Sequence, residues 1–313
     1  MTGSPQATVP GSSTHRLGIL YMLGAAFFFS LMSLLVKIAG RTLPAMELVL
    51  ARGVVTLIIS WTWLRAARIP MWGTQRKLLV IRGVLGFCGL ACFYFAITRL
   101  PLAEVTTIHF LNPVLTALLA ALLLRESVGW PLAVAIVTSL GGVLLVSRPD
   151  FLFGARAAAL DPAGLAAAIG GAVFSAGAYV AVRKLARTDH ALVIVFYFPL
   201  VAVPATLPLV WPVFVWPRGI EWWWLLGIGV STQIAQMFLT TGLARLSAGR
   251  AMTVGYTQIV FAALWGAIFF DAFPDAWSAV GAILVIGGAS LLAFTRDAPP
   301  GTARPGRSVR VDR

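Results

Sequence analysis

One stretch of strongly hydrophobic sequence carries Thr106, His109, Asn112 and Thr116 at helical spacing, within about 120° of arc. Pro113 lies in the same stripe and leaves one backbone carbonyl without its helical partner. Hydroxyl, imidazole and amide groups hydrogen-bond polar solutes, and in lipid they need a partner or a water-filled cavity. The stripe therefore indicates a solute-binding cavity, with hydrogen bonding between neighbouring helices as the alternative.

A second stretch places Gln233, Gln236 and Thr240 on one helix face. Two glutamines deep in a hydrophobic segment are costly unless they are used. We predict that they line the same cavity. Tyr94, which matches Thr240 in the internal repeat described below, is a further candidate.

Five more polar side chains lie within hydrophobic segments and are weaker candidates for binding a solute. Tyr256 could stack on a solute or donate a hydrogen bond to it, or could be a packed core tyrosine. The others are Ser30 and Ser33 in one stripe, and Ser175 and Tyr179 in another. Small hydroxyl residues inside such segments commonly pack helices together, which is the alternative for these positions.

Four residues could couple or gate a transport cycle. Arg52 lies eight residues beyond Pro44, about 12 Å along a helix, where an unpaired charge costs at least about 2.5–3.5 kcal/mol. Glu47 or a neighbouring helix is its expected counter-charge, and a structural ion pair is as good an interpretation as gating. Glu104 and His109 are the titratable candidates for proton coupling, with simple solvation and a neutral histidine as the alternatives.

No catalytic, metal or cofactor site is expected. His15, His109 and His190 are far apart, and the eleven acidic residues are scattered, unlike the clustered groups of a membrane transferase. Cys88 and Cys92 have no Cys or His partners at metal-ligand spacing. Without an ATP-binding motif, energy must come from a gradient or from exchange.

The elements that hold these residues follow from composition. Of 313 residues, 59% are hydrophobic and 11% are charged, against about 45–50% and about 25% in soluble domains. This excludes a soluble enzyme, a disordered chain and a nucleic-acid module. Hydrophobic runs of suitable length predict helices at about 17–38, 45–64, 78–98, 101–124, 130–147, 163–184, 190–211, 220–243, 250–270 and 276–295.

The fold predicted is an all-α integral membrane protein of ten transmembrane helices, formed by two inverted five-helix repeats. The expected units are an N-terminal tail (1–16), the first repeat (17–147), a link (148–162), the second repeat (163–295) and a basic tail (296–313). With both termini in the cytoplasm, seventeen basic residues, Arg82 included, lie inside and six outside, as the positive-inside rule requires.

The repeat appears at offsets of 146 to 147 residues. The matching positions are Phe27 and Lys37 with Phe174 and Lys184, Arg99-Leu100 with Arg245-Leu246, and Gly141-Gly142 with Gly287-Gly288. Because five spans are an odd number, the second half enters the membrane inverted. Inverted halves are typical of alternating-access transporters, in which the substrate binds where the halves meet.

The run from Arg99 to Ala120, followed by Arg125-Glu126 and Gly141-Gly142, resembles the EamA-type half of the drug/metabolite transporter superfamily. Glu47 with Arg52 fits the same pattern. The resemblance covers 17–147 and 164–295, and it implies ten helices, a bacterial inner-membrane location and transport of small metabolites. The second half departs from the pattern at two positions. Ile259 stands where the first half has Pro113, and Asp271 represents Glu126 but in a shifted sequence context.

The resemblance implies a secondary transporter, not an enzyme, that moves a small polar or amphipathic metabolite, amino-acid-like or a derivative, by alternating access. Export is preferred, and uptake of an S-adenosylmethionine-like or riboflavin-like nutrient is the alternative. The expected partners are the solute and membrane lipids, without nucleic acid, cofactor or metal. A homodimer is left open.

Overall fold

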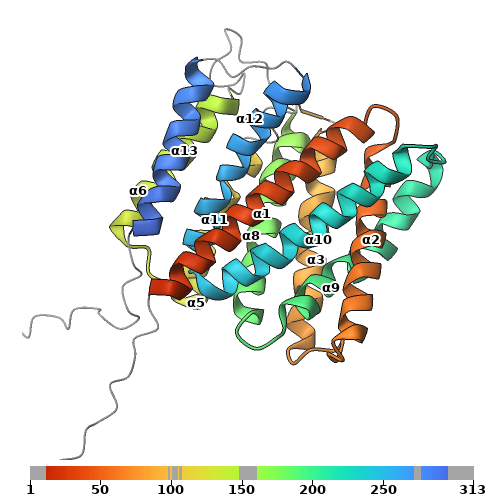
Figure 1. Cartoon of the computed structure of the whole chain (residues 1–313), viewed down its shortest axis with the longest axis horizontal. Coiled ribbons are helices and arrows are strands. Elements are labelled where there is room, and N and C mark those ends of the chain that lie inside the picture. Colours follow the sequence, from red (N-terminus) through yellow and green to blue (C-terminus); the bar gives the residue numbers. More distant parts are fainter. Residues whose placement is uncertain are drawn as a thin grey trace, which may run out of the picture.

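The computed structural model describes residues 12–97, 99–100, 105, 108–147, 161–270 and 276–294, in which all regular structure is helical. The helices are α1 (Ser12–Ala39), α2 (Ala45–Ala66), α3 (Arg76–Ile97), α5 (Asn112–Leu124), α6 (Trp130–Ser147), α8 (Pro162–Leu185), α9 (Ala191–Val210), the 3-10 helix η1 (Trp211–Val213), α10 (Glu221–Arg245), α11 (Ala248–Gly255), α12 (Thr257–Phe270) and α13 (Ala276–Phe294). Figure 1 shows them as one helical bundle. The all-α prediction is confirmed.

Helix lengths follow from the width of a bilayer. Six helical segments of the described chain are long and apolar enough to cross a membrane, and three shorter apolar helices accompany them. Most helices begin and end within a few residues of the predicted spans. Proline marks two of the starts: Pro44 precedes α2, and Pro162 opens α8, where the Asp161 carboxylate accepts a hydrogen bond from the Gly164 N–H.

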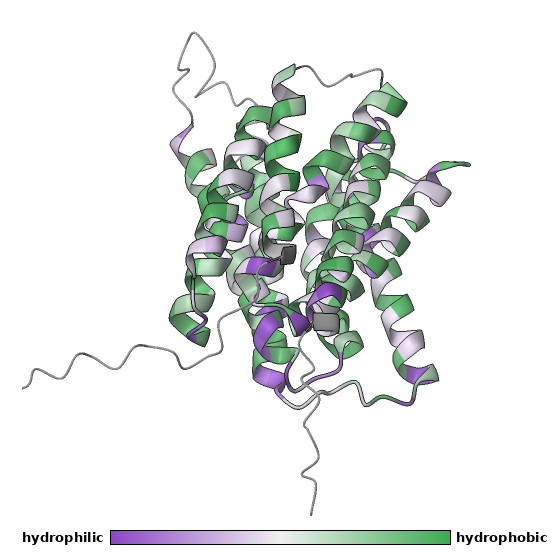
Figure 2. Cartoon of the chain, turned by 60° about the vertical axis from the view of Figure 1, so that its left-hand side comes forward, coloured by the Kyte–Doolittle hydropathy of each residue, from purple (hydrophilic) through white to green (hydrophobic). Residues whose placement is uncertain are grey.

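The helices consist mostly of hydrophobic residues, as Figure 2 shows, and many large apolar side chains are exposed on the outside of the bundle. Leu122, Trp130 and Val137 are each at least 70% exposed. Buried positions, in contrast, include polar and charged side chains such as Gln233 and Arg82. This inversion of the soluble pattern is expected when lipid surrounds the protein.

The two halves pack through contacts that repeat when the halves are exchanged. In the second half, α8 is equivalent to α1 and α10 is equivalent to α3. Helix α1 packs on α10, and α8 correspondingly packs on α3, while α6 pairs with its own equivalent, α13, at one side of the bundle. Within that last pair, Gly142 lies against Gly281 and Gly288 lies against Ala135. Gly142 and Gly288 are 146 residues apart, and so are Ala135 and Gly281. Reciprocal contacts of this kind indicate a pseudo-twofold axis between the halves.

Two predicted spans are not continuous helices. The span expected at 250–270 is divided into α11 and α12, which meet at Tyr256, and a turn at Phe110 and Leu111 precedes α5. In the first half Pro113 explains the turn, because it has no N–H to continue the helix. In the second half Ile259 replaces the proline, and a tighter turn from the Tyr256 N–H to the Thr253 carbonyl (3.2 Å) interrupts the helix instead.

One end of the bundle is closed by a polar network around Glu126, which follows α5. Its carboxylate accepts hydrogen bonds from Arg183 Nε and from the Ala248 N–H, both at 2.8 Å. Arg183 also donates to the Leu243 carbonyl at 2.7 Å. The network joins α5 of the first half to α8, α10 and α11 of the second.

Candidate functional site

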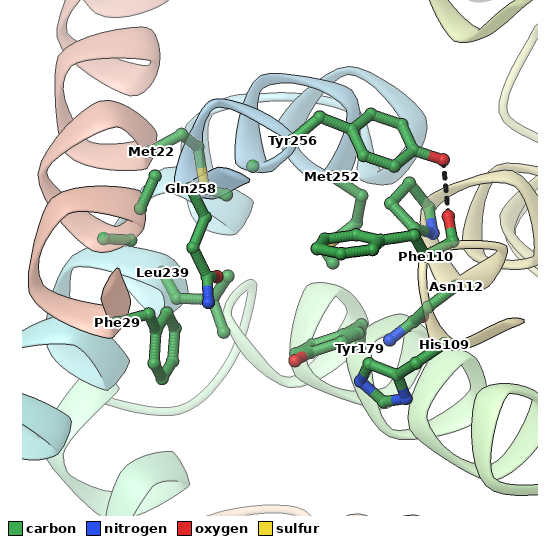
Figure 3. A pocket seen from close by; sticks show the side chains of 14 residues that line it. Met22, Phe29, His109, Phe110, Asn112, Tyr179, Leu239, Met252, Tyr256 and Gln258 are labelled. Carbon is green, nitrogen blue, oxygen red and sulfur yellow. Dashed lines mark hydrogen bonds between the residues drawn. The ribbon is translucent and has the colours of Figure 1, made fainter. Parts of the chain in front are cut away.

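A central cavity of about 90 Å³ lies where the two interrupted helices meet. Figure 3 shows the side chains around it. The lining residues are Met22, Ala25, Ala26, Phe29, His109, Phe110, Asn112, Pro113, Tyr179, Leu239, Met252, Gly255, Tyr256 and Gln258. They come from both halves of the chain.

The cavity lies on the pseudo-twofold axis. Phe110 and Tyr256 are 146 residues apart, and they touch: the Tyr256 hydroxyl donates to the Phe110 carbonyl at 2.7 Å, as Figure 3 shows. Asn112 and Gln258 are also 146 residues apart, and both line the cavity. Each half therefore contributes one interrupted helix and one carboxamide. Irregular backbone at membrane depth is tolerated where it lines such a cavity or is buried in protein.

The predicted stripe on the fourth span is partly brought to this cavity. His109 and Asn112 line it, and the Thr116 hydroxyl donates to Asn112 Oδ1 at 3.0 Å, which orients the amide. The His109 ring packs against Phe93, with centroids 4.9 Å apart, and its buried Nδ1 has no hydrogen-bond partner among the described residues. Thr106 and Glu104 lie outside the described residues.

The eighth-span glutamines are buried but do not line the cavity. Gln233 Oε1 accepts a hydrogen bond from Ser60 Oγ at 3.1 Å, and Gln236 Oε1 accepts one from Arg82 at 3.2 Å. Thr240 is fully buried, and its hydroxyl has no partner among the described residues. These side chains connect α10 to α2 and α3, so a role in binding a solute stays a prediction.

Of the remaining candidates, only Tyr179 and Tyr256 line the cavity. Ser30 donates to a carbonyl one turn earlier and accepts a bond from the Trp265 indole at 2.9 Å. Ser33 likewise donates to a carbonyl of its own helix. Ser175 lies against Gly89, where α8 packs on α3. The Tyr94 ring packs against Phe93.

Two expectations about charge are corrected by the structure. Glu47, one of the two expected counter-charges of Arg52, forms no ion pair with it among the described residues; its Oε2 accepts a hydrogen bond from the Val215 N–H at 3.0 Å, and its Oε1 is buried without a partner there. Arg82, counted above with the cytoplasmic basic residues, lies within α3 and is 3% exposed. Together, Arg52 and Arg82 place two guanidinium groups inside the bundle.

Gln258 was not selected from the sequence, because in one continuous helix over 250–270 it would lie on a different face from Tyr256. The helix break at Tyr256 changes that face. The offset of 146 residues from Asn112 was the signal that could have found it. The apolar lining residues Met22, Phe29 and Met252 carried no comparable signal, because they resemble ordinary packing residues.

The cavity is lined by a few hydrogen-bonding groups among mostly apolar side chains. No cluster of three metal-ligating side chains occurs within the part of the chain that the structure describes. Sites for small molecules usually measure about 300–1,000 Å³, so about 90 Å³ holds only a few waters. The cavity must therefore enlarge before it can admit a metabolite.

Fold and cavity together define a multi-pass membrane transporter, and comparisons with known proteins agree. The model of the EamA-like transporter family matches residues 16–148 and 162–294. The chain therefore belongs to the EamA-like transporter family, within the drug/metabolite transporter superfamily. It is a transporter and not an enzyme.

Two relatives and one solved structure illustrate the similarity. The pseudopaline exporter CntI of Pseudomonas aeruginosa is 35% identical over 278 residues, which cover 87% of this chain and 94% of that protein. The human solute carrier family 35 member G1 is 30% identical, over 86% of this chain and 77% of its own length. A crystal structure with 23% identity superposes with a TM-score of 0.75, covering 88% and 95% of the two chains, which supports the fold.

Proposed function

We propose that this protein exports a small polar organic metabolite through the inner (plasma) membrane by alternating access. The observation that carries the proposal is the placement of Asn112 and Gln258, equivalent residues of the two halves, in one cavity at the two helix breaks. Inverted halves that enclose such a site can rock about it and expose it to either side.

The polar network around Glu126 supports one closed state of this cycle. Because Arg183 and Ala248 of the second half bind Glu126 of the first, that end of the bundle opens only when these bonds break. Arg183, Arg187 and Arg245 are among the residues that the positive-inside rule places in the cytoplasm. We infer that the network closes the cytoplasmic side and that both termini are cytoplasmic.

Export is favoured over uptake by the name of the bacterial relative, which is an exporter. The direction is tested by extracellular metabolite profiles of cells that produce the protein, followed by flux of each released solute in inside-out and right-side-out vesicles. Export predicts accumulation in inside-out vesicles. Accumulation only in right-side-out vesicles would support the uptake alternative, and no solute flux at all would contradict both.

The cavity residues are tested with matched variants. Asn112→Leu removes the amide that Thr116 orients, and it should lower flux at least about tenfold because the polar solute then loses a buried hydrogen-bond partner. Thr138→Val is the control, since the Thr138 hydroxyl bonds only carbonyls of its own helix, α6. Equal flux in both variants would remove Asn112 from the site.

A further inference from the structure

Two arginines of the first half lie over one aromatic ring. Arg52 of α2 and Arg82 of α3 lie over Phe198 of α9, with guanidinium carbons 5.7 and 5.1 Å from the ring centroid. Within the described residues, neither arginine forms an ion pair. Two like charges therefore lie close together inside the bundle without an acidic partner there.

The unsatisfied buried atoms of these two arginines and of Gln233 are hydrogen-bond donors. Arg82 donates one bond, to Gln236 Oε1, while its Nε and Nη1 are buried without a partner among the described residues. Arg52 Nε and Gln233 Nε2 are in the same situation. A surplus of donors indicates that the missing component is an acceptor with several lone pairs.

Arg82 is buried and Arg52 is half-buried, and the contacts that they make do not compensate for the lost hydration. A cation–π contact is a weak interaction, whereas the free-energy cost of removing an ion from water is several times larger even after relaxation. Mutual repulsion adds to that cost. A carboxylate or phosphate group would remove the repulsion and could accept two parallel bonds from a guanidinium.

This cluster lies near the cavity. Tyr179, which lines the cavity, belongs to α8, the helix that packs on α3, where Arg82 lies. Gln236, which holds Arg82, lies less than one helical turn from the cavity residue Leu239. A solute in an enlarged cavity could thus extend one polar end between the two guanidinium groups.

We propose that Arg52 and Arg82 bind an oxyanion, a carboxylate or a phosphate, that the transported solute carries. This inference rests on the proposed export function and narrows its substrate to organic anions. Asn112, Gln258 and the aromatic residues then contact the remainder of the solute.

The test compares solutes released by cells that produce the wild type, Arg52→Gln, Arg82→Gln, the control Arg99→Gln or no protein. Mass spectrometry of the medium identifies each released compound, and immunoblots of membranes normalise the amounts. Arg99 is a suitable control because its side chain is 49% exposed and pairs with Asp161 at 3.6 Å, away from the cluster. We expect the wild type and Arg99→Gln to release compounds that bear a carboxylate or phosphate. Release should fall at least about tenfold in the other two variants, because each removes one partner of a buried charge contact.

The outcomes separate this inference from the function on which it rests. If the wild type releases only neutral or cationic compounds, or if Arg52→Gln and Arg82→Gln release as much as Arg99→Gln, the oxyanion site is wrong and the exporter remains. If the wild type releases nothing beyond cells without the protein, the export function itself fails. Should the glutamine variants not reach the membrane, the charge of the compounds released by the wild type decides.

Discussion

The two halves of this transporter share their packing but differ in charge. Helices α2 and α9 begin 146 residues apart, which makes Phe198 the counterpart of Arg52, and the same offset makes Ile228 the counterpart of Arg82. In contrast, each half contains one interrupted helix, and the contacts between α6 and α13 stay the same when the halves are exchanged. We infer that the shared features serve alternating access, whereas the arginines serve the binding of a particular solute.

The largest effect is expected when this difference is erased. The double variant Arg52→Phe, Arg82→Ile gives the first half the residues of the second. Release of the solute should fall at least about tenfold, while the free energy of unfolding should stay unchanged or rise by up to about 4 kcal/mol, since buried charges are replaced by apolar side chains. Thermal unfolding in detergent and metabolite release measure the two effects. A variant that is clearly less stable would show that the arginines hold the fold.

The shared packing predicts equal effects at equivalent positions. Gly142→Leu and Gly288→Leu each place a side chain against the partner helix of the α6–α13 pair, where no space exists for it. Each should lower the free energy of unfolding by about 1–3 kcal/mol. Unfolding in detergent should rank the two variants together. A large effect at one glycine and none at the other would contradict the pseudo-twofold packing.

The two ends of the bundle should respond differently to loss of an ion pair. Glu126→Gln weakens a network in which the Glu126 and Arg183 side chains are 13% and 14% exposed, and we expect a loss of about 1–3 kcal/mol. Arg99→Gln removes a pair with side chains 49% and 36% exposed, which contributes about 1 kcal/mol at most. Chemical denaturation of both variants gives the comparison. Equal losses would mean that Glu126 does not close the bundle.

The smallest effect is expected at the contact between the interrupted helices. Tyr256→Phe removes the hydrogen bond to the Phe110 carbonyl but keeps the ring. The expected loss is about 1 kcal/mol of unfolding free energy, measured by thermal unfolding against Tyr197→Phe. In that control the lost bond, to the Trp72 carbonyl, lies away from the cavity. A larger loss of flux than of stability in Tyr256→Phe alone would assign its hydroxyl to the solute.

The sequence predicted the spans well because bilayer thickness fixes their length. Asn112 and His109 do line a cavity, because their stripe and Pro113 mark one face of an interrupted helix, and their binding of a solute stays a prediction. The sequence could not show that Gln233 bonds Ser60, because periodicity gives a direction around one helix and says nothing about the neighbour there. Arg82 was misplaced for a related reason: a charge near the end of a hydrophobic run can belong to a loop or to a buried helix face.

The central claim is that one cavity, built from equivalent residues of two inverted halves, opens to each side in turn. Gln258→Cys, made with Cys88 and Cys92 replaced by Ala, tests it with a membrane-impermeant thiol reagent added to either side of sealed vesicles. The account predicts that this cysteine reacts from both sides and that the released solute slows both reactions, while a cysteine at the exposed position Leu122 stays unreactive. Reaction from one side only, or none that the solute slows, would contradict it.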